Sequence, residues 1–247
     1  KVPVPPLAEQ ERIVKLLDEA DDLRKLRAQA DTRTAQLIPA LFHDMFGDPL
    51  AHEGKWPEVL FQEVTDRITY GFTCPMQHLS SGVPIITAKN VLNGYIDFED
   101  VHYAESAEFT SLTAKSKPRR GDILITKDGT IGRCSPVNVD FPFCINQSVA
   151  LVQPKHDKVT PVYLSHLVLY PSVNALLNGM GKGQALKHLQ ITELAKLPIP
   201  LPPISRQIEF AERVSEIRSL ESAQAASHRR TEDLFQSMLH KAFNGEL

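Results

Sequence analysis

Residues 3–50 read PVPPLAEQERIVKLLDEADDLRKLRAQADTRTAQLIPALFHDMFGDPL, and residues 200–247 repeat this segment without a gap as PLPPISRQIEFAERVSEIRSLESAQAASHRRTEDLFQSMLHKAFNGEL. Thirteen of the 48 aligned positions are identical at this offset of 197 residues, from Pro3/Pro200 to Leu50/Leu247. Two copies of one segment, with a different segment between them, indicate a repeated structural element rather than a catalytic signature. We therefore expect two similar helices that hold other parts of an assembly and set the distance between them.

Each copy contains a helix pattern that follows a proline-rich strip. The prolines of residues 2–6 and 198–203 favour extended or polyproline II backbone. Apolar or small residues then recur after alternating steps of three and four, which predicts two long helices that pair as an antiparallel coiled coil. The predicted seam positions are Ile13, Leu16, Ala20, Leu23, Arg27, Ala30, Thr34, Leu37 and Leu41, and then Phe210, Arg213, Ile217, Leu220, Gln224, Ser227, Thr231, Leu234 and Met238. The alternative is two unrelated amphipathic helices that pack on a globular core.

The two copies differ at a single helix-breaking position. Pro39 lies inside the first helix pattern, so we expect that helix to break or kink there. Gln236 occupies this place in the second copy, and the second helix is expected to run straight.

The segment between the repeats has the sequence patterns of a domain that contains both strands and helices. Residues 83–88, 122–126 and 144–152 are rich in β-branched residues and are bounded by Gly, Pro and Asn, which predicts strands. Residues 121–132 predict a strand, a tight turn at Asp128-Gly129 and a second strand. Helices are expected over 161–177 and 191–196. The predicted fold class is α+β, with helical regions over 1–54 and 198–247 and one mixed α/β domain over 55–197.

Charge and composition narrow the class of protein. The net charge of −3 argues against a chain that is basic all over, although residues 115–133 are locally basic and residues 97–108 locally acidic. Such polarity lets a domain dock a polyanion in one orientation, and ordinary surface charge is the alternative. Three widely spaced cysteines indicate reduced thiols in a cytoplasmic protein. The uncharged run 159–181 contains two prolines, and we interpret it as a buried helical hairpin rather than a membrane span.

Motifs for catalysis and for metal binding are missing from the sequence. The sequence contains no Gly-Lys-Ser/Thr phosphate loop, no GxSxG nucleophile elbow, and no closely spaced pair among its nine histidines. The strip 201–204 (LPPI) lacks the polar first residue and the aromatic of an adenine methyltransferase tetrad. We therefore expect a non-catalytic chain without a metal or a cofactor of its own.

Four turns offer polar side chains for recognition. Glycines or strand ends fix these turns on the predicted sheet, so donors and acceptors project from a rigid base. Asn pairs bidentately with adenine, Lys reaches guanine or phosphate, and a cationic pair before a strand contacts phosphate. A solvated turn or an internal cap is the alternative for any single residue. The candidate DNA-contacting residues are Tyr70, Lys89, Asn90, Arg119, Arg120, Lys127, Asp128, Arg133, Lys182, Gln184, Lys187 and His188.

These features together resemble the specificity (S) subunits of type I restriction-modification systems. The conserved helical region of that family is similar to residues 5–13 (PPLAEQERI) and 41–49 (LFHDMFGDP). One target-recognition domain of the family is similar to the order of Trp56, Tyr70-Gly71, 82–85 (GVPI), 121–124 (GDIL), 129–132 (GTIG) and 197–203 (LPIPLPP). The resemblance covers essentially the whole chain.

The resemblance implies a non-catalytic DNA-reading subunit. Residues 55–197 would read one half of a bipartite sequence in double-stranded DNA, and the helices would act as a spacer that recruits the methylation (M) and restriction (R) subunits. Those subunits would bring S-adenosylmethionine and ATP. The chain departs from the family because it holds one recognition domain where a typical S subunit has two, and it does not begin with Met. We expect a C-terminal half, which could form a homodimer through its helices.

Two other functions compete with this one. A helical scaffold or oligomerisation protein would use the middle domain to bind protein. A fused nuclease or methyltransferase would need the motifs that the sequence lacks. Salt-dependent binding to duplex DNA separates the first from a DNA-reading subunit.

Overall fold

The computed structural model describes residues 6–51, 55–180 and 188–244. The chain divides into two compact units. We call Lys1–Leu41 together with Glu212–Leu247 the helical unit, and Phe42–Ala211 the mixed unit. The division into sequence regions at 54/55 and 197/198 stays a prediction.

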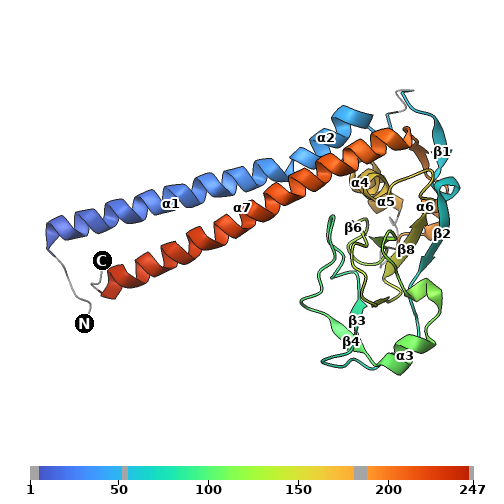
Figure 1. The fold of residues 1–247 in the computed structure, drawn as a ribbon, viewed down its shortest axis with the longest axis horizontal. Helices are drawn as coiled ribbons and strands as arrows, with labels where there is room; N and C mark the ends of the chain where they lie inside the picture. Colours follow the sequence, from blue (N-terminus) through green and yellow to red (C-terminus); the bar gives the residue numbers. More distant parts are fainter. Residues whose placement is uncertain (1–5, 52–54, 181–187, 245–247) are drawn as a thin grey trace. The chain divides into compact units, whose positions relative to one another are not determined.

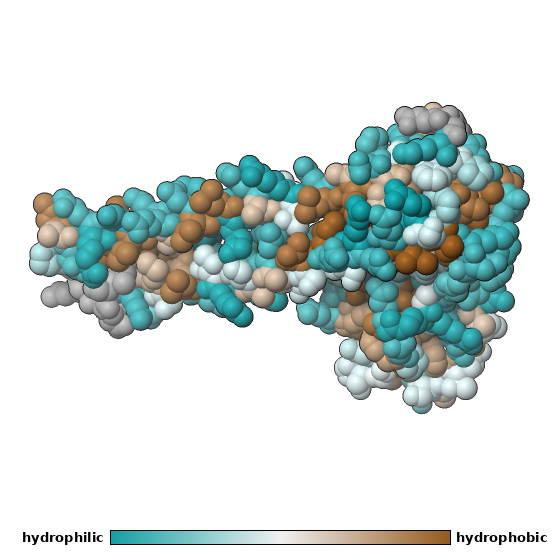
Figure 2. Space-filling view, turned by 45° about the horizontal axis from the view of Figure 1, so that its top comes forward, coloured by the Kyte–Doolittle hydropathy of each residue, from teal (hydrophilic) through white to brown (hydrophobic). Residues whose placement is uncertain are grey.

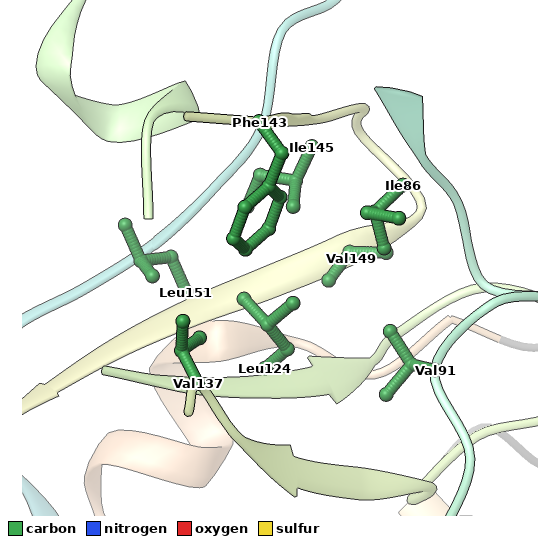
Figure 3. Close-up of a cluster of buried hydrophobic side chains, with 8 residues drawn as sticks. All are labelled: Ile86, Val91, Leu124, Val137, Phe143, Ile145, Val149 and Leu151. Atoms are coloured by element: carbon green, nitrogen blue, oxygen red, sulfur yellow. The ribbon is translucent and has the colours of Figure 1, made fainter. Parts of the chain in front are cut away.

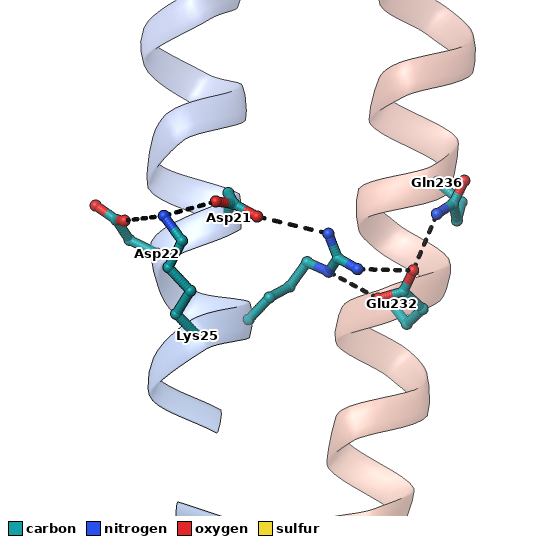
Figure 4. Close-up of polar contacts among 6 residues, drawn as sticks. Asp21, Asp22, Lys25, Glu232 and Gln236 are labelled. Atoms are coloured by element: carbon teal, nitrogen blue, oxygen red, sulfur yellow. Dashed lines mark hydrogen bonds and ion pairs between the residues drawn. The ribbon is translucent and has the colours of Figure 1, made fainter. Parts of the chain in front are cut away.

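In the helical unit, α1 (Leu7–Ala35) lies beside α7 (Ile204–Asn244) and runs in the opposite direction (Figure 1). Arg24 Nε donates to Glu232 Oε2 at 2.8 Å, and Arg27 Nη2 donates to Ser227 Oγ at 2.6 Å. Gln236 donates to Glu232 from the next turn of α7, and Asp21 pairs with Arg24 at 3.5 Å within α1 (Figure 4). The amide of Gln236 and the guanidinium of Arg24 together lower the pKa of Glu232. Polar pairs therefore join the two helices, while interlocking of their side chains as a coiled coil stays a prediction.

Part of the predicted seam is wrong. Leu23, Leu220 and Leu234 are 58%, 58% and 61% exposed, and apolar patches show at the surface of the two helices (Figure 2). Next to these exposed positions, Arg24 pairs with Glu232 and lies over the ring of Phe235, 4.4 Å from its centroid. Other predicted seam positions do meet, since Arg27 bonds to Ser227. The contact between the helices is therefore partly polar, and a pattern of hydrophobic residues does not predict such pairs.

The helix break predicted at Pro39 is confirmed, but it comes earlier in the chain. Helix α1 ends at Ala35, and α2 (Leu37–Phe46) begins two residues later. A proline ring clashes with the carbonyl group four residues before it, which here belongs to Ala35. Helix α7 continues without a break through Gln236, as predicted.

The mixed unit contains three sheets, which confirms the predicted α+β class. The larger sheet has the order β2-β8-β5-β6 and is antiparallel throughout. The second has the order β4-β3-β7, with β3 and β7 parallel, and the third pairs β1 with β9. The strands are β1 (Glu58–Leu60), β2 (Thr65–Tyr70), β3 (Val83–Ile86), β4 (His102–Ala104), β5 (Ile123–Thr126), β6 (Cys134–Pro136), β7 (Cys144–Ile145), β8 (Val149–Pro154) and β9 (Pro198–Pro200).

Two sequence predictions are refined in this unit. A hairpin is present as β5 and β6, but its second strand lies at 134–136, beyond the expected range 121–132, and a loop of residues 127–133 replaces the expected tight turn at Asp128-Gly129. The run 144–152 forms two strands separated by a turn at Asn146. The helix expected over 161–177 is a pair, α4 (Pro161–Leu169) and α5 (Pro171–Met180), because Pro171 cannot continue α4. The remaining helical elements are η1 (Phe61–Val64), α3 (Ser106–Ser111), η2 (Ala114–Ser116) and α6 (Ile191–Ala195).

Two clusters of buried side chains hold the mixed unit together. The first lies between the two larger sheets (Figure 3) and contains Ile86, Val91, Leu124, Val137, Phe143, Ile145, Val149 and Leu151. The second is aromatic: the ring of Phe42 lies 5.6 Å from that of Tyr163 and 5.5 Å from that of Phe210. The buried Tyr163 hydroxyl donates to the carbonyl oxygen of Pro200 at 2.7 Å, which satisfies its polar group. Within residues 6–51, 55–180 and 188–244, no helix has both the length and the apolar character needed to cross a bilayer.

Candidate nucleic-acid interface

Strand pairing brings two of the predicted turns, those that follow Tyr70 and Thr126, to one end of the strands of the largest sheet. Tyr70 ends β2 opposite Ala150, and Thr126 ends β5 opposite Val149. The residues that follow β2 and β5 therefore meet the turn that precedes β8. We call this edge, made of residues 70–73, 127–128, 146–148 and 188–191, the recognition edge.

Lys127, Asp128 and His188 form a chain of charged groups at the recognition edge. Asp128 Oδ1 accepts from Lys127 Nζ at 2.7 Å and lies 2.6 Å from His188 Nδ1. Backbone bonds fix the geometry, because Leu189 N donates to the carbonyl oxygen of Lys127 at 2.8 Å. When a neutral His188 donates from Nδ1, its Nε2 is left as an acceptor. The carboxylate thus orients both the ammonium group and the imidazole.

The Tyr70 ring lies near two ammonium groups. The ammonium groups of Lys127 and Lys115 each lie 5.4 Å from its centroid, within the range of cation–π attraction. Lys127 is neutralised by Asp128, whereas Lys115 is not paired with a carboxylate of any described residue. The unpaired ammonium group of Lys115 beside the ring therefore suits an anionic phosphate backbone.

A cavity of about 250 Å³ opens between these side chains. Tyr70, Lys127 and His188 line it together with Thr73, Gln147 and Gln190. Sequence reasoning missed Lys115, Thr73, Gln147 and Gln190. Thr73 and Gln147 each come two or three residues after a strand, so their distance from a strand end is the only signal that could have indicated them.

A second basic cleft, of about 470 Å³, contains Arg119 and Arg120. Arg120 makes two hydrogen bonds with Asp140, at 2.6 and 2.7 Å, which lowers the pKa of Asp140. The guanidinium of Arg119 has no acceptor among the described residues, so it is the better placed of the two for a phosphate. Asp122 anchors the turn of Arg119, because its carboxylate accepts from the backbone N–H of Arg119 at 2.8 Å. Burial raises the pKa of Asp122.

The remaining predicted residues divide into three groups. Asn90 is corrected: it is 2% exposed, it accepts from Thr87 and donates to the carbonyl oxygen of Asp100, so its amide stabilises the loop and does not face a base. Lys89 is exposed and pairs with Asp100 at 3.0 Å, and Arg133 is partly buried beyond the β5–β6 turn. Lys182, Gln184 and Lys187 lie outside the described residues. Among the residues that are described, no group of three or more His, Cys, Asp or Glu side chains is arranged to hold a metal ion.

The sequence of this chain is similar to a known family of DNA specificity domains. Residues 72–226 match the family model described as the type I restriction modification DNA specificity domain. The chain is 29% identical to the type I restriction enzyme EcoBI specificity subunit of Escherichia coli, and 26% identical to the EcoKI specificity subunit of Escherichia coli strain K12. Both matches cover 100% of this chain but only 58% and 57% of the relatives. The chain thus spans somewhat more than half the length of these relatives.

Solved structures share the fold. A chain from work on complex assembly and conformational transition of the type I R-M system aligns with a TM-score of 0.67 and 24% identity, over 100% of this chain and 62% of that one. The HsdS subunit from Thermoanaerobacter tengcongensis aligns with a TM-score of 0.59 and 24% identity, over 100% and 61%. At these identities the alignments support the fold alone.

Proposed function

This chain belongs to the type I restriction modification DNA specificity family, and from that premise we propose that it is a sequence-specific DNA-binding subunit of a type I restriction-modification complex. The observation that carries the proposal is the recognition edge, which gathers Tyr70, Lys127 and His188 around one cavity. The ammonium group of Lys115 lies beside it, 5.4 Å from the centroid of the Tyr70 ring. The mixed unit would read one half of a bipartite target. The chain would itself be non-catalytic, with S-adenosylmethionine and ATP bound by partner subunits in the cytoplasm.

The charged side chains of the mixed unit divide into some that would position the DNA and some that would read its bases. Lys115 and Arg119 carry unpaired positive charge, and cations of this kind fix the register of a protein on duplex DNA through phosphate contacts. The Lys127–Asp128–His188 chain presents oriented donors and acceptors, which suit base edges in the major groove. Binding through such groups weakens steeply as salt rises, because bound phosphates release counterions.

An exchange of the middle segment tests the proposal. Residues 55–197 are replaced by the corresponding segment of another family member, and the DNA sequence bound is determined by selection from a duplex pool. We expect the target to change with the segment, while recruitment of the methylation subunit is kept. Unchanged specificity would contradict the proposal, and binding that is weak and independent of salt would favour a protein-binding scaffold instead.

The helical unit would act as spacer and as the surface that recruits the M and R subunits. Half-sites one helical turn apart lie about 34 Å from each other, and a helix of 29 residues such as α1 is about 44 Å long at 1.5 Å per residue. A paired rod of this length is sufficient to set such a spacing. Its test is co-purification of the methylation subunit with a chain that carries Leu23→Glu and Leu220→Glu on the exposed sides of the two helices, which should lose the subunit.

The internal repeat also supports a homodimer. In the second copy, Gln207 is buried and accepts from Thr160 N at 2.9 Å, and Phe210 is buried against Phe42. The equivalent end of α1 exposes Leu7 by 71% and Val14 by 56%. We propose that the mixed unit of a second copy covers this end of α1 in the way that its own mixed unit covers the start of α7.

Light scattering at rising concentration tests the homodimer. We expect the mass of two chains for the wild type and of one chain for Val14→Glu, whereas Gln29→Glu on the exposed side of α1 should leave the dimer intact. A single-chain mass for the wild type at high concentration would contradict the proposal.

A further inference from the structure

The cavity at the recognition edge contains two glutamine side chains that no internal contact occupies. Gln147 and Gln190 both line the cavity, and both are exposed. Neither amide makes a hydrogen bond with a residue that the structure describes. Elsewhere in the mixed unit, the buried Gln207 and the half-buried Gln153 bond to the protein itself.

The backbone around Gln147 is fixed on both sides. Asn146 Oδ1 accepts from Ser148 N at 3.1 Å and from Ser148 Oγ at 2.6 Å, and Ser148 Oγ accepts from Ala88 N at 2.9 Å. The carbonyl oxygen of Ser148 accepts from Lys127 N at 3.0 Å. Every hydrogen-bonding side chain of this turn is therefore used within the protein except that of Gln147, which projects from a rigid base.

Gln190 is held in a comparable way. Its carbonyl oxygen accepts from Glu193 N and Leu194 N at 3.0 and 3.1 Å, so its backbone is part of the first turn of α6. The side chain does not cap that helix, although Gln190 stands at the capping position. Leu189 next to it is bonded to Lys127, which ties this residue to the same edge as Gln147.

We propose that Gln147 and Gln190 are specificity-determining residues that read adenine in the major groove. A glutamine amide donates to adenine N7 and accepts from its N6 amino group, a pair of bonds that no other base offers in the same arrangement. The unpaired ammonium group of Lys115, 5.4 Å from the centroid of the Tyr70 ring, would hold the phosphate backbone beside the cavity, which fixes the two amides relative to the base edges. This inference rests on the proposed function.

Selection from a randomised duplex pool tests the inference with the full chain. Gln147→Ala and Gln190→Ala should each lose the preference for adenine at one position, by roughly 5- to 150-fold for a bidentate contact. Gln147→Glu should change the preference at that same position from adenine to cytosine, because a carboxylate accepts from the cytosine N4 amino group. A merely structural role would not produce such an exchange.

Controls separate the possible failures. Gln62→Ala, at the opposite end of β2 from Tyr70, should keep the wild-type preferences, and all variants should keep the wild-type unfolding midpoint and salt dependence. Wild-type preferences in both alanine variants would overturn the inference and leave the proposed function intact. A wild-type chain that selects no sequence would overturn the proposed function itself.

Discussion

Replacing Gly71 by alanine tests how the recognition edge is built. An added Cβ would lie 1.9 Å from the carbonyl oxygen of Ile145 and 2.5 Å from that of Asn146, both backbone atoms, so the chains must separate by about 1.1 Å to reach the 3.0 Å limit of real contacts. That movement breaks the bond from Phe72 N to Ile145 O, now 3.0 Å. Over-packing costs about 1–3 kcal/mol and a lost hydrogen bond about 0.5–1.5 kcal/mol. We expect the free energy of unfolding to fall by about 2–4 kcal/mol.

Urea unfolding followed by the fluorescence of Trp56, the single tryptophan, measures this change within the mixed unit. Two other glycines serve as matched controls. Gly129 has φ +76° and no atom within 4 Å of an added Cβ, so Gly129→Ala should cost only the backbone strain, about 1–2 kcal/mol. Gly179 lies in α5 with the same open space, and Gly179→Ala should stabilise by about 0.5 kcal/mol. A Gly71→Ala variant within 0.5 kcal/mol of the wild type would refute the close approach of β2 to the 145–146 backbone.

Three further predictions concern the mixed unit. Phe42→Ala should lower its free energy of unfolding by about 3–5 kcal/mol, measured by urea unfolding, because the ring is 1% exposed among four other aromatic rings. A thiol reagent should modify only the exposed Cys74 in the folded chain and all three cysteines in denaturant, since burial raises the pKa of Cys144 to about 12. Burial also raises the pKa of Asp122, so the folded state binds its proton more tightly and this group destabilises the fold as pH rises through the raised pKa. The stability of Asp122→Asn relative to the wild type should therefore increase over that pH range and stay constant above it, as unfolding at several pH values would show.

The sequence predicts the elements of this fold better than their contacts. The repeat and Pro39 predict two helices, one broken and one continuous, because these features act locally on the backbone. The exposed Leu23 and Leu234 show the limit of the same reasoning, since the frame of the seam depends on which side chains meet across it. Arg24 and Glu232 are 208 residues apart, and no local pattern links them.

In the candidate site, too, the sequence predicts which residues lie in turns but not which turns meet. Glycine and strand ends mark Tyr70 and Lys127 as turn residues, but only the pairing of β2 and β5 with β8 brings them to one edge. The same local signal selects Asn90, whose amide is used inside its own loop. For Gln147 the only local signal is its distance from a strand end, because the turn that presents it is held by bonds between Ser148 and the side chain of Asn146.

The repeat explains why the two helices of one chain pair with each other. Asp31 and His228 are equivalent positions of the two copies, and they meet at 3.0 Å, as equivalent residues do where an approximate two-fold axis crosses an antiparallel pair. Two copies of α1 paired in the same way would bring Asp31 against Asp31, which is repulsive, whereas Asp31 against His228 is a hydrogen bond and, when the imidazole is protonated, an ion pair. Because the two copies hold different residues at this position, Asp31 and His228, pairing of α1 with α7 of the same chain is favoured over pairing of α1 with α1 of another chain. A homodimer of the kind proposed would add a second mixed unit at the exposed end of α1 and leave this pairing unchanged.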